Sequence, residues 1–383
     1  MVRVNVSRLI FYISFIFIVF AKFIQQTVYI EKIDFLNITT RIIIVFACIF
    51  LIFKYIIDKH STESIIYSTL ILIVAGLISY ITSGWYVIMV LAILLINMKN
   101  INIRKLIIIW IIEISILMLF IAISYKLGVI GETIISWDRD TGIGRYTLGY
   151  NYTTFSSNYF FHLTIFYLYI KGNLIKYLEL GVLALLNIYL YNFTNTKAAV
   201  IYSVLAIILV ILIKIFNFSK GVSYINKFSM FVGGFVAGLL TYLYKYDSAI
   251  ISEINVILSG RLYYGYKGIE EYGITLFGQK ITWITEVIFD SELQYNYIDS
   301  SYLNILFNYG IIVLLFVMLG YYFLGKKNIS NDIYYSILIL IITLHSMFDP
   351  QLIEIMYNPS ILLLGYVITR SRYMDSVRGG NNA

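Results

Sequence analysis

The chain alternates long apolar runs with short polar connections over most of its length. A helix that crosses the hydrocarbon region of a bilayer needs about 20 apolar residues, with a range of roughly 17–25. Runs near this length predict membrane-spanning helices at 8–24, 42–57, 65–82, 84–98, 106–127, 158–171, 174–192, 197–214, 228–246, 301–324, 333–348 and 354–369. The pattern therefore predicts an all-α, polytopic membrane protein with about 12 transmembrane helices.

Two connections are much longer than the others. Residues 128–157 join the fifth and sixth predicted spans, and residues 247–300 join the ninth and tenth. Loops longer than about 12–15 residues are usually functional or disordered, and Trp137, Trp283 and many tyrosines argue against disorder. We divide the chain into spans one to nine with the first long loop (1–246), the large loop (247–300), spans ten to twelve (301–369) and a basic tail (370–383).

The distribution of charge predicts the orientation. Lysine and arginine accumulate in cytoplasmic connections. If the N-terminus lies inside, most of the 28 basic residues fall in inside segments, whereas acidic residues concentrate in the large loop 247–300. Both termini are therefore predicted to be cytoplasmic and both long loops to lie outside. The first apolar run follows Arg3 and Arg8 and lacks a small-residue cleavage site, so we expect it to remain as the first span.

Composition supports a membrane protein and narrows its class. Hydrophobic residues make up 60% of the chain and charged residues 13%, against roughly 45–50% and 25% in soluble domains. Basic residues lie scattered between apolar runs, so the formal net charge of +7 does not indicate nucleic-acid binding. The single cysteine, Cys48, and three scattered histidines do not predict a metal site or another cofactor site. With only two prolines, both late in the chain, the spans do not resemble the broken helices of transporters.

The first long loop carries two arginines among glycines, Arg139 and Arg145. The guanidinium fork suits bidentate binding of phosphate or diphosphate, and neighbouring glycines allow a substrate to approach the backbone closely. Asn151 and Asn158 lie where the sixth span begins and are further candidates for substrate binding. The alternative is that the arginines pair with the aspartates beside Arg139, which would neutralise Arg139 more than Arg145.

The large loop opens and closes with charged candidates. Near its start, Arg261 precedes Tyr264 and Lys267. Such a group suits a glycan diphosphate, because aromatic faces stack on sugars while cations hold the phosphates. For the tyrosines an interfacial aromatic belt is the favoured alternative. Asp299 ends the loop just before an apolar helix, where it can act as a base, serve as an N-cap, or do both.

Two carboxylates fall inside predicted spans. Ionisable residues within a membrane are functional hypotheses by default. Glu113 lies deep in its span and is kept as a candidate for substrate binding, whereas Glu179 lies close to Lys176 and is expected to reach the interface.

Four further polar residues carry no predicted catalytic role. His162 and His345 are interpreted as packed polar contacts. Asp349 and Glu354 flank an outside turn, and their pattern indicates no function.

Three short patches resemble a known family. They read GRYTLGYNYTTFSSN (144–158), SGRLYYGYKGIEEYGITLFGQ (259–279) and DSSYLNILFNYG (299–310). In order, spacing and topology they resemble the Wzy-type O-antigen and capsule polymerases, which share a superfamily with the O-antigen ligases. The family's outside-loop arginines bind the diphosphate-linked glycan, which corresponds by patch to Arg145 and Arg261.

The resemblance implies a membrane glycosyltransferase of the GT-C class in the bacterial plasma membrane. Such an enzyme joins undecaprenyl-diphosphate-linked oligosaccharide repeats on the outer face, without a nucleotide sugar, metal or other cofactor. It implies a lipid environment, a chain-length regulator and a flippase as partners, and no nucleic acid. Arg261 and Arg145 would stabilise the departing diphosphate, and Asp299 would take the acceptor proton.

The ligase branch differs at one position. It has a histidine, then Asn, Ser or Gln, then nine residues and a glycine, where the large loop re-enters the membrane. Here Asp299 occupies the histidine position, Ser300 follows and Gly310 is the glycine, while Val313 stands where a small residue or tyrosine is expected. The missing histidine favours a polymerase over a ligase.

Two alternatives come from other classes of protein. A lipid-linked oligosaccharide flippase would need polar residues in several spans. A scaffold protein is disfavoured only weakly, by the two arginine-bearing loops.

Overall fold

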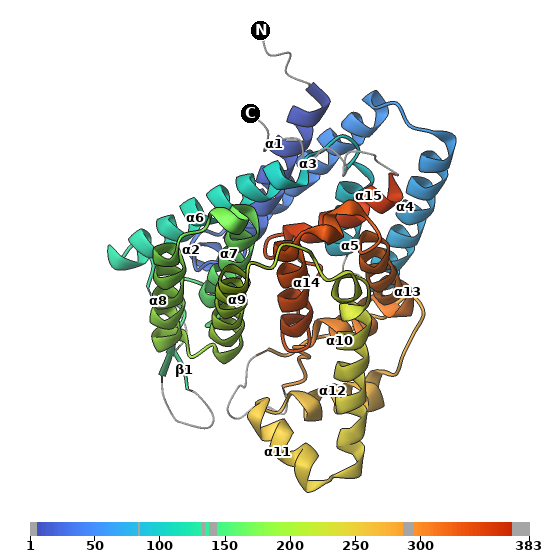
Figure 1. The fold of residues 1–383 in the computed structure, drawn as a ribbon. Coiled ribbons are helices and arrows are strands. Elements are labelled where there is room, and N and C mark those ends of the chain that lie inside the picture. The colour runs from blue at the N-terminus through green and yellow to red at the C-terminus, as the bar shows by residue number, and fades with distance from the viewer. Residues whose placement is uncertain (1–5, 83–84, 132–134, 138–143, 286–294, 370–383) are drawn as a thin grey trace.

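Long apolar helices make up most of the fold (Figure 1). The structure, a computed structural model, describes residues 6–82, 85–131, 135–137, 144–285 and 295–369. Within these ranges, seven helical segments are long and apolar enough to cross a membrane: α1 (Val6–Ile24), α3 (Leu36–Ile57), α4 (Thr62–Thr82), α6 (Ile103–Lys126), α9 (Lys197–Phe216), α10 (Ser223–Leu243) with η2 (Tyr244–Tyr246), and α13 (Ser301–Leu324). This confirms a helical, polytopic membrane protein, while the number of 12 spans stays a prediction.

The remaining elements are shorter. They are the helices α2 (Tyr29–Lys32), α5 (Trp85–Ile96), α7 (Phe155–Lys171), α8 (Tyr177–Thr194), α11 (Ala249–Ile257), α12 (Arg261–Tyr272), α14 (Ile333–Ser346) and α15 (Leu364–Ile368), and the 3-10 turns η1 (Gly172–Leu174), η3 (Asn328–Asn331) and η4 (Pro359–Leu363). Three of these segments, around α5, α14 and η4 with α15, are apolar but too short to count as spans by length alone.

The predicted helix at 354–369 is wrong in its first part. Residues 347–358 form irregular turns, and helical structure resumes only at Pro359. Proline fits the first position of a helix because the N–H that it lacks would have no partner there. Asn358 stabilises the turn, since its Nδ2 donates to the carbonyl oxygen of Leu352 at 2.8 Å. The segment 347–358 is therefore a buried, hydrogen-bonded turn.

Both long loops contain structure of their own. In the first, β1 (Ile135–Trp137) and β2 (Gly144–Tyr146) pair in antiparallel fashion, and in the second lie α11 and α12. The apolar pattern did not predict the strands. In Figure 1, β1, α11 and α12 lie at the lower end of the bundle, opposite the start of α1 and the end of α15. The two loops thus share one end of the molecule, and the placement of that end outside the cell stays a prediction.

The orientation can be tested with reporter fusions. We expect alkaline phosphatase fused after Tyr295 to be active and the same enzyme fused after Lys327 to be inactive. The reason is that Lys326 and Lys327 should stay on the cytoplasmic side while the acidic loop is exported. Colony colour on a phosphatase substrate measures this, with immunoblots to show equal amounts of both fusions. The reverse pattern would contradict the topology.

Helix α14 occupies the centre of the bundle (Figure 1). Nearly all of its side chains are buried, and it packs against α7, α9 and α10. A helix that is apolar on every face belongs inside such a bundle. Its final turn holds His345, and the chain then continues into the buried turn 347–358.

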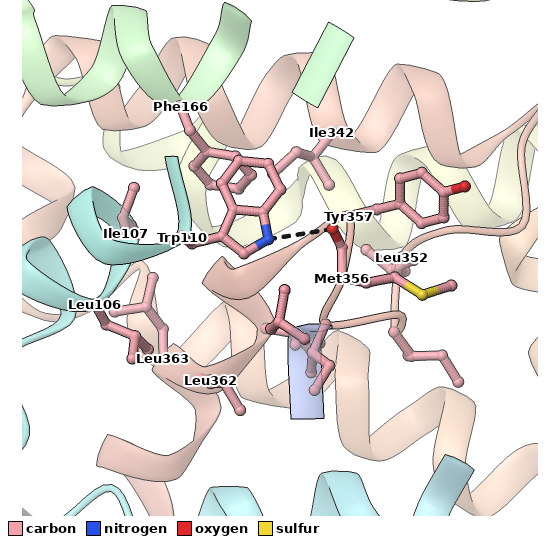
Figure 2. Close-up of a cluster of buried hydrophobic side chains, with 14 of the residues drawn as sticks. Leu106, Ile107, Trp110, Phe166, Ile342, Leu352, Met356, Tyr357, Leu362 and Leu363 are labelled. Atoms are coloured by element: carbon pink, nitrogen blue, oxygen red, sulfur yellow. Dashed lines mark hydrogen bonds between the residues drawn. The ribbon is translucent and has the colours of Figure 1, made fainter. Parts of the chain in front are cut away.

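A cluster of apolar side chains holds the turn 347–358 against the helices (Figure 2). Trp110 of α6 is fully buried, and its indole Nε1 donates to the carbonyl oxygen of Met356 at 3.1 Å. The indole packs edge-on against Phe166 of α7, with 5.3 Å between ring centroids. A backbone carbonyl away from water needs such a donor. This hydrogen bond fixes the turn in the bundle.

Helix α12 packs closely through two glycines. A Cβ on Gly265 would lie 2.8 Å from Thr241 of α10, and one on Gly268 would lie 2.4 Å from Ile298. Since larger residues would push α12 away, the glycines let it lie directly against α10 and the start of α13. The position of Arg261, the first residue of α12, follows from this packing.

Helix α13 is interrupted at Gly310, where the backbone adopts φ 82° and ψ 174°. The large loop docks into this break. The backbone N–H groups of Ile311 and Ile312 donate to the carbonyl oxygens of Thr275 at 3.0 Å and Leu276 at 3.3 Å. This φ/ψ region is essentially restricted to glycine. The break therefore anchors residues 275–278 to the middle of a long apolar helix.

Candidate functional site

An ion pair joins the two ends of the large loop. Arg261 Nε lies 3.1 Å from Asp299 Oδ2. Gly260, with φ 82°, turns the chain from α11 into α12, and Arg261 Nη1 donates to the carbonyl oxygen of Leu258 at 3.3 Å. Both charged side chains keep partial access to solvent, with 28% and 29% of their surfaces exposed. The structure thus brings together two of the three predicted catalytic residues.

The N-cap alternative for Asp299 is wrong. Ser300 is the N-cap residue of α13, and the Ser300 side chain makes no capping hydrogen bond. Asp299 precedes the cap and faces the guanidinium of Arg261. The ion pair with Arg261 therefore explains the carboxylate at position 299, and helix capping does not.

A second carboxylate, Asp349, lies beside this pair in the turn 347–358. It is buried, and its Oδ1 accepts from Asn158 Nδ2 at 3.2 Å. Its Oδ2 lies 3.6 Å from His345 Nε2, and its main-chain oxygen accepts from the Ser301 hydroxyl. Burial and the negative charge of Asp299 raise the pKa of Asp349 to about 8, although Arg261 and Asn158 act in the opposite direction. Asp349 therefore changes its charge near neutral pH.

Two histidines complete the buried end of the site. His162 Nδ1 lies 2.8 Å from the carbonyl oxygen of Asn158, so this nitrogen carries the proton in that contact. The rings of His162 and His345 lie 5.2 Å apart at nearly right angles, and His345 stacks on Phe161 at 4.3 Å. Both are packed polar contacts as interpreted from the sequence, and His345 in addition contacts Asp349.

Sequence reasoning assigned no function to Asp349. One aspartate in a turn after an apolar run has no local signature, and its hydrogen-bond partner Asn158 lies 191 positions away. The spacing of four residues between His345 and Asp349 is a local signal, because residues that far apart face each other on a helix. The sequence pattern predicts that Asn158 binds substrate, whereas in the structure its Nδ2 donates to Asp349 Oδ1.

The candidates of the first long loop bind neighbouring helices. Arg145 Nε on β2 donates to the carbonyl oxygen of Thr194, the last residue of α8, at 2.9 Å. Asn151 Nδ2 donates to the carbonyl oxygen of Gln25 at 3.2 Å, which ties the loop to the end of α1. Arg139 and the aspartates beside it lie outside the described residues. The tyrosine after Asn151, Tyr152, is close enough to influence the charge on Arg261.

Tyr264 and Lys267 follow Arg261 on α12. The Tyr264 ring packs edge-on against Tyr295, with 4.8 Å between centroids. Lys267 Nζ lies 3.5 Å from Glu271 Oε1, one turn later on the same helix. Pairs of this kind between exposed side chains contribute at most about 1 kcal/mol, so this pairing leaves Lys267 able to exchange its partner.

The two carboxylates within predicted spans, Glu113 and Glu179, lie outside the site around Arg261. Glu113 lines a groove of about 470 Å³ together with apolar side chains of α1, α3 and α6: Ile16, Phe17, Phe20, Ile43, Ile109, Ile112, Ile116 and Leu117. The groove shares no lining residue with the Arg261 site, so the structure does not join Glu113 to the predicted arginines. Glu179 pairs with Lys171 at 3.0 Å and accepts from the backbone N–H of Lys176 at 2.7 Å. Glu179 thus caps the start of α8.

No protein-family model, no curated protein sequence and no solved structure matches the chain. The resemblance to the Wzy-type polymerases therefore stays a prediction that rests on the three sequence patches.

Proposed function

We propose that the chain is a polysaccharide polymerase that joins polyprenyl-diphosphate-linked oligosaccharide repeats at the outer face of the bacterial plasma membrane. The observation that supports this most is the meeting of Arg261, Asp299 and Asp349 at the loop end of a bundle of apolar helices. This arrangement offers a cation for an anionic lipid-linked substrate and carboxylates for a hydroxyl acceptor. The three sequence patches favour the same activity.

Charge stabilisation by arginine would supply much of the catalysis. In the transfer, the bond between the anomeric carbon of the growing glycan and its diphosphate oxygen breaks. The acceptor hydroxyl of a new lipid-linked repeat forms the new bond to that carbon. Negative charge grows on the departing diphosphate, and a fixed cation there lowers the barrier because it binds that charge more strongly in the transition state. Arg261 fits this role, because its side chain is partly exposed and its guanidinium can exchange Asp299 for phosphate oxygens.

Other residues would position the substrate. The first long loop, at the same end of the bundle, carries Arg145 and Asn151 and, in its sequence, Arg139. These residues would contact the diphosphate or the sugars from that side. Tyr264 offers an aromatic face for a sugar ring, and Lys267 offers a second cation two turns from Arg261. Asn158 contributes through Asp349, to which its amide donates. Glu113 would contact the lipid part of the substrate within its apolar groove.

A direct test uses the purified protein in vesicles. We expect it to convert short polyprenyl-diphosphate-linked repeats into a ladder of longer glycans, with no nucleotide sugar present and with chelator added. Gel electrophoresis of the released glycan measures this, and cells that lack the gene should carry single repeat units on their surface. Attachment of glycan to a lipid other than the polyprenyl carrier would indicate a ligase instead. Movement of intact repeats across the bilayer without bond formation would indicate a flippase.

A further inference from the structure

The two carboxylates of the site have different partners, which suggests different roles. Asp299 lies 3.1 Å from a guanidinium, which favours its ionised, charge-neutralised state. Asp349 Oδ2 instead lies 3.6 Å from Nε2 of the His345 imidazole, which carries a charge only when it is protonated. A carboxylate held by arginine is a weak base, whereas one beside a neutral ring keeps its affinity for a proton.

We propose that Asp349, supported by His345, accepts the proton of the acceptor hydroxyl, and that Asp299 acts as a positioning residue for Arg261. This inference rests on the proposed polymerase function and assigns the base within the same site. It replaces the expectation from sequence that Asp299 is the base.

The exposed fractions of the side chains agree with these two roles. Arg261 and Asp299 are more than a quarter exposed, whereas the Asp349 side chain is 11% exposed and that of His345 is 3% exposed. A bulky lipid diphosphate meets the exposed pair first. A single sugar hydroxyl is a far smaller group, and the exposed 11% of the Asp349 side chain is the part that it would contact. Asn158 Nδ2 holds Oδ1 at 3.2 Å, which leaves Oδ2, on the side of His345, for the proton.

Several charged or titratable groups face Asp349 from the elements around it. Asp299 precedes α13, and Arg261 lies on α12. His345 of α14 contacts Asp349 directly, and His162 of α7 packs against His345. Three tyrosines, on α9, in the large loop and in the turn 347–358, also interact electrostatically with Asp349: Tyr202, Tyr297 and Tyr357. Burial and Asp299 favour the protonated form of Asp349, and Arg261 favours the ionised form. Diphosphate bound to Arg261 would cancel part of that positive charge, which makes Asp349 a stronger base when the donor is in place.

The step balances without any further reactant. The acceptor oxygen forms its bond to the anomeric carbon, and the diphosphate leaves with the electron pair of the broken bond. The hydroxyl proton moves to Asp349 Oδ2. After transfer, this proton returns to water or to the departing diphosphate, which restores the ionised carboxylate. Asp299 takes no part in the exchange and holds the guanidinium of Arg261 between turnovers.

The proposal predicts how the rate depends on pH. With a pKa of about 8, Asp349 is ionised in about one in ten molecules at pH 7 and in most molecules at pH 9. Because the ionised form accepts the proton, the elongation rate at limiting substrate, which reports the pKa of Asp349 in the free enzyme, should rise roughly tenfold from pH 7 to 9. If Asp299 were the base, its pairing with Arg261 would keep it ionised over this whole range, and the rate would be flat.

The experiment compares pH profiles of purified wild type and variants in vesicles, from pH 6 to 9, with a lipid-linked repeat as substrate. Asp349→Asn keeps the acceptor for Asn158 but cannot take a proton, so elongation should fall roughly 100- to 10,000-fold and lose its rise with pH. Asp349→Glu should recover part of the rate together with a pH rise. Asp299→Asn should lower the rate and raise the KM for the lipid diphosphate. The pH rise should persist but move to lower pH, because the negative charge of Asp299 no longer raises the pKa of Asp349.

The outcomes separate the inference from the function on which it rests. A wild-type enzyme that elongates with a flat profile would overturn the role of Asp349 and leave the polymerase standing. The role of Asp349 is equally overturned if Asp299→Asn, and not Asp349→Asn, removes the pH rise. If the wild type elongates nothing at any pH, the proposed function fails and the inference fails with it. Binding of a polyprenyl diphosphate to Asp349→Asn shows whether that variant has folded.

Discussion

Replacement of Arg261 by lysine should reduce chain elongation by roughly 100-fold or more, even though the charge is kept. The guanidinium can hold two diphosphate oxygens at once, and its Nε contacts Asp299 while Nη1 contacts the carbonyl oxygen of Leu258. A lysine ammonium is a single point and cannot form this set of contacts. The length of the polymer ladder, in cells that carry only the variant gene, measures the effect.

The matched control is Lys267→Arg on the same helix. Lys267 pairs with Glu271 near the surface, and arginine preserves that pair, so this variant should lose much less activity. Immunoblots must show equal amounts of both proteins in the membrane. A full ladder from Arg261→Lys at normal protein level would show that Arg261 does not clamp the diphosphate.

Replacement of Gly310 by alanine should strongly destabilise the protein. A Cβ at this position would lie 2.3 Å from the carbonyl oxygen of Leu276 and 2.5 Å from the backbone nitrogen of Gly278. The positive φ adds backbone strain to these contacts, and together we expect a loss of about 3–5 kcal/mol in stability. Thermal unfolding of the purified protein in detergent, followed by tryptophan fluorescence, measures this loss.

Gly238→Ala on α10 provides the comparison. No atom lies within 4 Å of a Cβ at Gly238, and alanine favours a helix over glycine by about 1 kcal/mol. This variant should be as stable as the wild type or slightly more stable. If Gly310→Ala unfolded at the wild-type temperature, α13 would have to be continuous at this point in solution.

The sequence predicted the helices far better than the site. Apolar runs such as 197–214 and 301–324 match α9 and α13 closely, because a lipid-embedded helix must carry a long apolar stretch of its own. The first residues of the predicted span at 354–369 are turns, since a segment buried by protein can be equally apolar without being helical. Apolarity alone does not distinguish contact with lipid from contact with protein.

The site was predicted only where its residues stand next to a recognisable pattern. Arg261 and Asp299 lie at the two ends of the large loop, and their predicted importance required no knowledge of their contact. The pKa of Asp349 depends on Asn158, Asp299 and Arg261, which come from three other parts of the chain. No local window of sequence contains that information, because burial and neighbouring charge arise only when the chain folds.

The buried turn 347–358 has a consequence for the order in which the protein matures. A ribosome delivers this turn after Trp110, Asn158, Arg261 and Asp299 have already emerged. Until the turn arrives, the indole N–H of Trp110 lacks the carbonyl of Met356 and the amide of Asn158 lacks the carboxylate of Asp349. A chain still being synthesised can therefore insert the helices that precede this turn while the proposed site is incomplete. The proposed activity would begin only after the turn 347–358 has reached the membrane, so nascent chains that lack this turn would not consume the proposed lipid-linked substrate.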